Sequence, residues 1–364
     1  MKKLLAILLA TMLLVAATAC SQEPAPAAVE APAAVEAAPA TEPEPAPAAV
    51  EAPAAAEETD AVVAPDGFPK KEIELVVPLN PGGGTDLMCR KLAEIIYNKY
   101  GVNIVVSNVP GSGGVVGATQ VFSGKNDGYT WTMAGATVVS QMVRGQLGFT
   151  MDQITWLQPL YGMNHVILVS ADSPYATAED FINAAVANPG KVSIGHNGTF
   201  NTAQAGLIAL GRAYGDDNLF LSMPFDGASR AITELMGGNV DAVIVGIGDV
   251  LSYINEGTVK PLLVVGFDKL PAFPDVTTVA DLGFDETNFE NVTYVRWLLC
   301  GPEGVDPEIT AYVASLFRGA METEEFQKYA YDGAYDVDTT HGEAMVELAN
   351  EYYKVVETWS NYFE

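Results

Sequence analysis

Between residues 67 and 364, short apolar runs alternate with longer segments in which apolar residues recur every three or four positions. Short runs rich in Val, Ile and Leu are typical of buried strands, and the longer spacing is typical of amphipathic helices. We expect strands at Ile73–Val77, Ile104–Ser107, Tyr129–Ala134, Val166–Ser170, Lys191–Gly195, Ser222–Pro224, Ala242–Val245, Leu262–Val265 and Tyr294–Leu299. We expect helices near Asp86–Tyr100, Gly114–Phe122, Val138–Arg144, Ala178–Ala187, Thr202–Tyr214, Ser229–Met236, Pro307–Met321, Glu324–Tyr331 and Gly342–Phe363. This alternation predicts an α/β fold with largely parallel sheets.

Two glycine-rich turns each connect a predicted strand to a predicted helix. The first turn runs from Asn80 to Asp86, and the second runs from Asn108 to Gly114. A strand, a glycine turn and a helix together direct backbone N–H groups and the positive end of a helix toward one point, where a phosphate or a carboxylate can bind. Because ligands of open α/β sheets sit at the carboxyl ends of the strands, we predict that both turns bind one small anion.

A nucleotide is the less favoured anion. In the second turn, the glycine that would complete a G-x-G-x-x-G motif falls at Gly117, one residue late, and no P-loop lysine follows. Both signatures of a phosphate-binding nucleotide site are therefore incomplete.

Residues suited to catalysis or metal binding are sparse. His165, His196 and His341 are widely separated and form no H-E-x-x-H motif, and Ser112 lacks the first glycine of a G-x-S-x-G turn. A metal pair of His165 and His196 is an alternative, less favoured than two structural histidines. We expect neither enzymatic activity nor a cofactor.

The N-terminus has the pattern of a secretory signal peptide. Two lysines precede the apolar stretch Leu4–Val15, and the small residues Ala17–Ala19 follow it. The apolar stretch is too short for a permanent membrane span. Cleavage after residue 19 would leave Cys20 as the first residue, which resembles a bacterial lipoprotein box and predicts a lipid anchor. Ordinary secretion, with Cys20 incidental, is the alternative.

Residues 21–66, which follow Cys20 in the segment 20–66, consist almost entirely of Ala, Pro, Glu and Val, and the unit Ala-Pro-Ala-Ala-Val-Glu recurs within them. Such a composition buries too little apolar surface to offset chain entropy, so we expect an extended, disordered tether. Low complexity without a function is the alternative. A lipid at one end and a folded body at the other would place the body outside the cell membrane and attached to it.

Charge and cysteine content narrow the function further. The chain carries a net charge of −28, of which about −20 belongs to the body from residue 67 onward. No cluster of Lys and Arg occurs, so nucleic-acid binding is not expected. Cys89 and Cys300 could pair in an exported protein; two buried free thiols are slightly favoured.

The body resembles the Bug solute receptors, the extracytoplasmic binding components of tripartite tricarboxylate transporters of the TctC type. The motifs that carry the resemblance are Phe68–Pro69, Ile73–Pro78, Pro81–Asp86, Asn108–Gly114, Asp127–Thr130, Asp172–Pro174, Thr177, Asp180–Phe181, Asn188–Gly190, Gly198, Pro224–Gly227 and Glu234–Asp241. Their order and spacing are more specific than any one of them, and they cover essentially the whole body.

The resemblance implies a two-lobed periplasmic-binding-protein fold of the type II-like class, with two crossover strands and a central cleft. Lobe I is expected to comprise residues 67–168 plus 293–364, and lobe II residues 169–292. A ligand that bridges both lobes would bias a hinge motion toward the closed state.

The residues expected to bind the ligand lie on loops that follow predicted strands. They are Gly82, Gly83, Gly84, Thr85, Gly111, Ser112, Gly113, Gly114, Ala136, Thr137, Thr199, Asn201, Thr202, Asp226 and Gly227. The alternatives are that the glycines merely form tight turns and that Thr199, Asn201 and Thr202 cap the next helix. Asp86 is expected to cap its helix or organise the first turn rather than contact an anion.

The predicted function is capture of a small organic di- or tricarboxylate and its delivery to the permease subunits of a tripartite tricarboxylate-type transporter. Phe225 and Asp226 stand where the family usually has Tyr and Lys, and the family's aspartate near Val245 and histidine near Ala203 are missing. These differences leave open a neutral or cationic solute. A sensory binding protein that docks on a receptor kinase is the third possibility.

Overall fold

The computed structural model describes residues 63–285, 289 and 294–363. The predicted signal peptide, Cys20 and all but the last residues of the predicted tether lie outside this part of the chain. The strands are β1 (Ile73–Val77), β2 (Ile104–Asn108), β3 (Thr130–Ala134), β4 (Ile154–Ser170), β5 (Ser193–His196), β6 (Leu221–Pro224), β7 (Ala242–Gly246), β8 (Val259–Val265), β9 (Thr277–Thr278) and β10 (Tyr294–Pro302). The α-helices are α1 (Gly84–Tyr100), α2 (Val115–Phe122), α3 (Ala136–Val143), α4 (Ala178–Ala187), α5 (Thr202–Ala213), α6 (Ala228–Met236), α7 (Leu251–Asn255), α9 (Pro307–Met321), α10 (Glu324–Asp332) and α11 (Glu343–Ser360). Short 3-10 helices are η1 (Ser112–Gly114), η2 (Met151–Gln153), η3 (Ile247–Asp249) and η4 (Asn361–Phe363).

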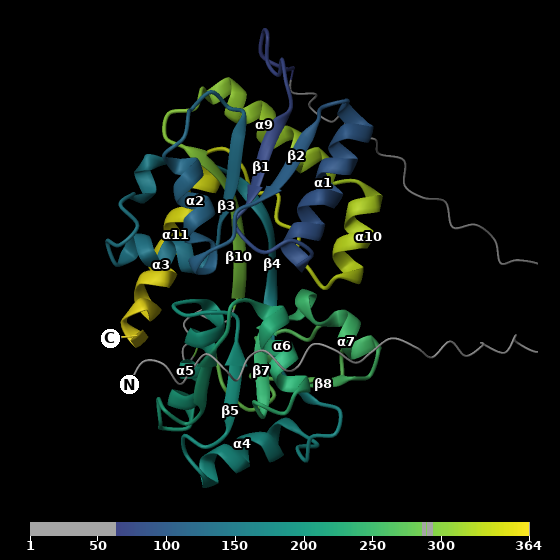
Figure 1. The fold of residues 1–364 in the computed structure, drawn as a ribbon, viewed down its shortest axis with the longest axis vertical. Coiled ribbons are helices and arrows are strands. Elements are labelled where there is room, and N and C mark those ends of the chain that lie inside the picture. Colours follow the sequence, from purple (N-terminus) through teal and green to yellow (C-terminus); the bar gives the residue numbers. More distant parts are fainter. Residues whose placement is uncertain (1–62, 286–288, 290–293, 364) are drawn as a thin grey trace, which may run out of the picture. The chain divides into compact units, whose positions relative to one another are not determined.

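In the described residues, the strands form one mixed sheet in the order β2-β1-β3-β10-β4-β7-β5-β6, with β8 beside β4 and β9 beside β8 (Figure 1). The pairs that β1 makes with β2 and β3 are parallel, as are those that β5 makes with β6 and β7. The pairs of β4 with β10, β7 and β8 are antiparallel. The prediction of largely parallel pairing therefore holds on both flanks of the sheet and fails at its centre.

Strand β4 joins the two halves of this sheet. Its residues Ile154–Asn164 pair with β10, and its residues His165–Ser170 pair with β7 and β8. We call β2, β1, β3, β10 and the start of β4 the first half, and the remaining strands the second half. The chain leaves the first half along β4 and is back in it at β10, where Tyr294 pairs with Asn164.

Helices cover both faces of the sheet. One buried cluster gathers side chains of α1, α6, α9 and α10, and the other gathers side chains of α2, α3, α4, α5 and α11. Figure 1 shows α1 and α10 on one side of the first half and α2, α3 and α11 on the other. Cys89 belongs to the first cluster and Cys300 to the second, and both are buried free thiols. Burial raises the pKa of each thiol, which keeps both protonated.

The hydrophobic pattern locates most elements to within a few residues. The predicted strand Ile73–Val77 and the predicted helices Ala178–Ala187 and Pro307–Met321 coincide with β1, α4 and α9. The pattern misses α7, β9 and the first two thirds of β4.

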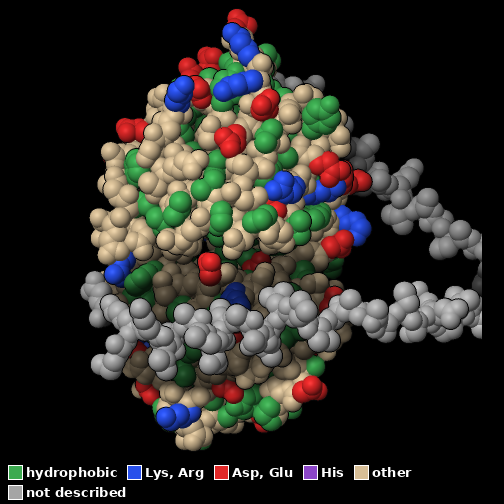
Figure 2. Space-filling model, viewed as in Figure 1, with side chains coloured by type: hydrophobic (Ala, Val, Ile, Leu, Met, Phe, Trp, Pro, Cys, Tyr) green, Lys and Arg blue, Asp and Glu red, His purple; other side chains and the backbone are tan. Residues whose placement is uncertain are grey.

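Charged side chains of both signs lie on the face of the molecule that Figure 2 shows. Figure 2 shows Lys and Arg interspersed with Asp and Glu on this face, and a hollow between the two halves. Within the described residues, no helix combines the length and apolar character that a membrane span requires.

Candidate ligand-binding pocket

A pocket of about 330 Å³ opens between the two halves, at the carboxyl ends of their parallel strands. Both glycine turns, the start of α3, the loop before α5 and the turn before α6 contribute to its wall, and β4 and β10 form its floor. A volume of this order is at the small end of the range for small-molecule sites.

Twelve of the predicted ligand-binding residues line this pocket. They are Gly83, Gly84, Thr85, Gly111, Gly113, Gly114, Ala136, Thr137, Asn201, Thr202, Asp226 and Gly227.

Gly82, Ser112 and Thr199, also predicted as ligand-binding, lie outside the wall. The N–H of Gly82 turns toward a carboxylate of its own turn, as described below. Ser112 and Thr199 are exposed, and positive φ angles at Gly198 (116°) and Phe200 (56°) reverse the chain on either side of Thr199.

Asp86 organises the first turn, as predicted. Its Oδ2 accepts a hydrogen bond from the N–H of Gly82 at 2.9 Å, and its Oδ1 accepts one from Asn108 Nδ2 at 2.9 Å. Arg90, one helical turn later, forms an ion pair with the same carboxylate. Burial would raise the pKa of Asp86, but the bonds from Arg90, Gly82 and Asn108 outweigh it and hold that pKa below its usual range.

Asn108 extends this arrangement to the second turn. Its Nδ2 also donates to the carbonyl of Leu79 at 3.2 Å, and its Oδ1 accepts from Arg90 at 2.9 Å. The side chains of Asp86, Arg90 and Asn108 therefore fix the two glycine turns to each other.

The N-terminus of α1 meets a second carboxylate of the chain itself. The N–H of Gly84 donates a hydrogen bond to Asp249, which ends η3 in the second half. Burial raises the pKa of Asp249 to about 6, and the bond from Gly84 offsets only part of that rise. Two N–H groups of the first turn, those of Gly82 and Gly84, are thus occupied by Asp86 and Asp249. The expectation that the first turn offers them freely to a ligand is corrected accordingly.

The second turn differs in this respect. Within the described residues, the N–H groups of Gly111 and Gly113 have no hydrogen-bond acceptor, whereas the N–H of Gly114 donates to the carbonyl of Gly111 at 3.1 Å. Gly113 has a φ of 64°, and a Cβ there would lie 2.8 Å from Thr137 Cγ2. The N-terminus of α3 begins beside this turn, and its N-cap, Gly135, provides no side-chain cap. Unused donors therefore gather near Thr137.

The loop before α5 contributes amide groups from the second half. Asn201 caps α5, because its Oδ1 accepts from the N–H of Gln204 at 3.0 Å. Its Nδ2 lies 3.3 Å from both the carbonyl oxygen and Oδ1 of Asn197. Asn201 thus caps a helix and lines the pocket at once.

His196 supports this loop from behind the pocket wall. Its ring nitrogens lie 2.6 Å from the carbonyl of Gly198 and 2.8 Å from Ser222 Oγ. Burial lowers the pKa of His196 to about 4, against a weaker opposing effect of the Gly198 contact. The ring is neutral at physiological pH and structural in role. No cluster of potential metal ligands occurs among the described residues.

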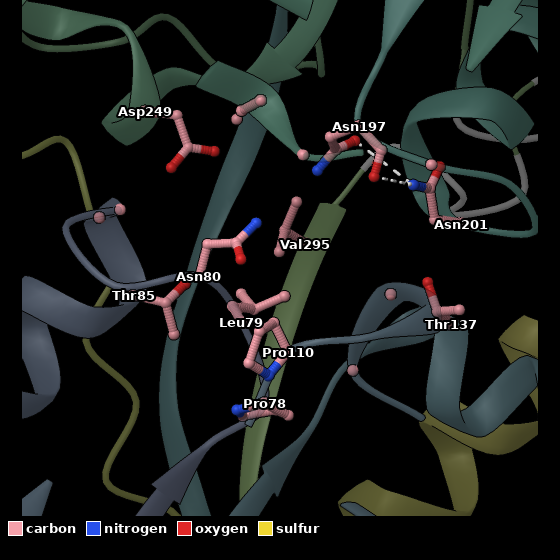
Figure 3. A pocket seen from close by; sticks show the side chains of 18 of the residues that line it. Pro78, Leu79, Asn80, Thr85, Pro110, Thr137, Asn197, Asn201, Asp249 and Val295 are labelled. Carbon is pink, nitrogen blue, oxygen red and sulfur yellow. Dashed lines mark hydrogen bonds between the residues drawn. The ribbon is translucent and has the colours of Figure 1, made fainter. Parts of the chain in front are cut away.

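Besides Asp86, five polar residues of the wall were not predicted to bind the ligand, namely Asn80, His165, Asn197, Ser229 and Asp249. Asp249 follows β7 by three residues, so the strand-end rule that located the glycine turns would have indicated it. Figure 3 shows Asp249 on one side of the pocket and Thr137, Asn197 and Asn201 toward the other, with Asn80 and Val295 between them.

The charges of the described wall are all negative. Asp86, Asp226 and Asp249 line the pocket, and no Lys or Arg does. Only Asp86 of these three has an ion pair within the described residues.

The model of the tripartite tricarboxylate transporter family receptor, TctC, matches residues 88–357. The chain belongs to this family. BugT of Bordetella pertussis is 28% identical to it over 298 residues, which cover 80% of this chain and 89% of BugT. A protein of Cupriavidus necator from the region 5′ of gbd is 29% identical over 267 residues, or 72% of this chain and 78% of that protein.

Solved structures show the same fold. MatC of Rhodopseudomonas palustris with bound malate has a TM-score of 0.71 at 23% identity, covering 82% of this chain and 100% of MatC. The periplasmic binding protein BugD has a TM-score of 0.70 at 22% identity, covering 81% of this chain and 97% of BugD. As a TctC-family receptor, the chain is an extracytoplasmic solute-binding protein and not an enzyme. Its fold is the mixed α/β fold of periplasmic binding proteins.

Proposed function

We propose that this receptor captures a small carboxylate in the pocket between the two halves of its sheet and delivers it to membrane subunits of a tripartite tricarboxylate-type transporter. The family match and the malate-bound and adipate-bound structures of the same fold support a carboxylate. The observation that carries the proposal is the pair of unused N–H groups at Gly111 and Gly113, beside Thr137.

The chemistry of the second turn suits a carboxylate oxygen. Backbone N–H groups form shorter and stronger bonds to a charged oxygen than to a neutral one. The N-termini of α2 and α3 add a positive potential at the same point, and neither has a side-chain cap that would compete. Thr137 at the start of α3 adds a hydroxyl donor.

The acidic surface of the body does not prevent anion capture. Exposed charges more than about 8–10 Å away are largely screened at physiological ionic strength. The N–H groups of the pocket act at contact distance. The surface charge would slow the approach of an anion, so we expect the association rate to rise with salt.

In this proposal the other predicted residues of the wall complete the site. Asn201 and Thr202 would contact the ligand from the second half, and the remaining glycines of the wall would let it approach the backbone. Thr85 is already engaged, because its Oγ1 lies 2.5 Å from the hydroxyl of Tyr161, so its role is to hold the wall in place. Asp226 and Gly227 would close the rim.

Calorimetric titration tests the proposal. The full chain is titrated with carboxylates of three to six carbons and, as a matched control, with the uncharged amide of each acid. We expect a carboxylate to bind in the micromolar range or tighter and its amide to bind far more weakly. If no carboxylate binds, or amides bind equally well, the proposal is wrong.

We further propose that Cys20 carries a lipid that anchors the receptor to the extracytoplasmic side of the bacterial membrane, with residues 21–66 as the tether. The signal peptide pattern and the Ala/Pro/Glu composition support this. In cells, Cys20→Ala is expected to move the protein from the membrane fraction to the soluble fraction. An unchanged distribution would overturn the anchor.

A further inference from the structure

Asp249 lines the pocket, and no Lys or Arg of the described residues lines it with Asp249. Its Oδ1 lies 3.1 Å from the position that a Cβ at Gly84 would occupy, and its Oδ2 lies 3.4 Å from the corresponding position at Gly246. The carboxylate is therefore held between the first turn, the end of β7 and the pocket space. Within the described residues, no Lys or Arg forms an ion pair with it.

The titratable neighbours of Asp249 come from several elements. Tyr335 packs against η3, the short helix that carries Asp249, since its hydroxyl lies 2.6 Å from the position that a Cβ at Gly248 would occupy. Tyr161 comes from β4. His165 of β4 and Asp86 of α1 line the same pocket, and Asp86 forms an ion pair with Arg90. Proximity to Asp249 raises the pKa of both Tyr161 and Tyr335, although burial is the larger cause in each case. Neither phenol can supply a positive charge.

The two ends of the pocket therefore differ in character. The end near Thr137 offers unused N–H donors, and the end near Asp249 offers a partly desolvated carboxylate (Figure 3). An uncompensated carboxylate in such a place is unfavourable unless a cation or a proton joins it. A ligand can provide that cation.

We propose that the solute is a carboxylate that also carries a cationic nitrogen, with its carboxylate at Gly111 and Gly113 and its nitrogen against Asp249. This inference rests on the proposed function and narrows its substrate class to amino-carboxylates. A dicarboxylate in the same orientation would place a second negative charge beside Asp249, and like charges at contact distance disfavour each other.

The main competing explanation is that Asp249 binds a dicarboxylate in its protonated form. At pH 7.5 the pKa of about 6 leaves Asp249 mostly ionised, and a ligand ammonium would favour that state further. A dicarboxylate would instead need to bring a proton with it. The two explanations predict opposite effects of pH on affinity.

Calorimetry at pH 7.5 with the full chain separates them. The probes are α-amino and ω-amino carboxylates of two to six carbons, each compared with its deaminated acid and with the dicarboxylate of equal length. We expect the best amino-carboxylate to bind at least about tenfold more tightly than either analogue, as a charge-assisted contact requires. Asp249→Asn is expected to remove this preference, while Asp275→Asn, at an exposed position outside the pocket wall, should keep it.

The wild-type comparison alone decides the outcome, so it does not depend on the variants folding. A dicarboxylate that binds as tightly as any amino-carboxylate, and whose affinity rises as the pH falls from 7.5 to 5.5, overturns the inference. The proposed function would still stand. If neither kind of carboxylate binds, both are overturned.

Discussion

Two aspartates of the pocket, Asp86 and Asp249, have pKa values that are shifted in opposite directions. Asp86 accepts three kinds of donor and keeps a lowered pKa, whereas Asp249 has one backbone donor and a pKa raised to about 6. Asp86 is the last residue of the short segment Gly84–Asp86, and Asp249 contacts the first residue of this segment, Gly84. One carboxylate therefore stabilises the turn, and the other is left for a ligand or a proton.

A glycine pair tests the fit of the second turn. Gly113 and Gly145 both have positive φ angles, 64° and 66°, but a Cβ at Gly145 meets nothing within 4 Å, whereas one at Gly113 meets Thr137 at 2.8 Å. Both Gly→Ala variants should lose about 1–2 kcal/mol of stability through the left-handed backbone. Only Gly113→Ala should also lose at least about tenfold in carboxylate affinity, because the turn must shift. Equal affinity in the two variants, measured by calorimetry, would contradict the site.

His196 makes stability depend on pH. Its folded pKa of about 4 lies below its ordinary value of 6.5, so the unfolded state binds more protons between these values. The stabilisation is complete above pH 6.5 and is lost as pH falls toward 4, by at most about 3 kcal/mol. Asp249, whose pKa is raised, acts in the opposite direction below pH 6.

The wild type must therefore be compared with His196→Gln, which retains hydrogen-bonding groups but does not titrate. From pH 7 to pH 4.5, urea unfolding should show the wild type losing about 2–3 kcal/mol more than the variant. Parallel stability curves would show that His196 is not buried in its neutral form.

Sequence reasoning at the residue scale succeeded where chemistry is local. The glycine turns and the organising role of Asp86 depend on neighbours within a few positions, and both were predicted. The contact of Asp249 with Gly84 joins residues far apart in the chain, so no local pattern contains it. The position of Thr199 outside the pocket wall has a similar origin, because the chain reversal at Gly198 and Phe200 decides whether Asn197 or Thr199 lines the pocket.

At the scale of elements, a polar link holds the two glycine turns in register. Asn108, at the end of β2, bonds both to Asp86 in α1 and to the carbonyl of Leu79. The link is separate from the pairing of β1 with β2 and fixes the loops beyond the strand ends. The position of the donors at Gly111 and Gly113 depends on it.

A double-mutant cycle measures this link. Asp86→Ala, Asn108→Ala and the double variant should give a coupling free energy of about 1–2 kcal/mol, because the bond is charge-assisted and its acceptor is buried. The exposed i,i+4 pair Lys328–Asp332 serves as the control and should couple by less than about 0.5 kcal/mol. Similar coupling in both cycles would mean that the link does not stabilise the turns.

Strand β4 shows where the hydrophobic pattern stops being informative. The pattern predicted Val166–Ser170, but the strand begins at Ile154. Pro159 interrupts the run, and the register with β10 shifts there, from Tyr161 opposite Trp297 to Pro159 opposite Leu298. A bulge at a proline removes the simple alternation on which strand prediction relies.

At the scale of the folded body, several contacts within the described residues join the two halves, and two of them lie close to the pocket residues. Asp249 of the second half accepts from Gly84 of the first, and the guanidinium of Arg144, at the end of α3, lies 4.3 Å from the ring centre of Phe200 in the second half. Two buried nitrogens of Arg144 have no hydrogen-bond partner in the described residues. These contacts favour the arrangement of the halves that the structure shows.

Removal of one contact should shift the population toward an open form. Spin labels at Val116→Cys and Met236→Cys occupy exposed positions on the two halves, and the two cysteines of the described residues, Cys89 and Cys300, are buried. Arg144→Ala should move the distance distribution to longer values and weaken ligand affinity a few-fold, and a saturating carboxylate should restore the short distance. An unchanged distribution would show that Arg144 does not hold the halves together.

The decisive measurement is a crystal structure of the receptor with a bound carboxylate. We expect a ligand carboxylate oxygen at about 2.7–3.2 Å from the N–H nitrogen of Gly111 or Gly113, with the far end of the ligand toward Asp249. A carboxylate bound with no contact to the second glycine turn would contradict this expectation.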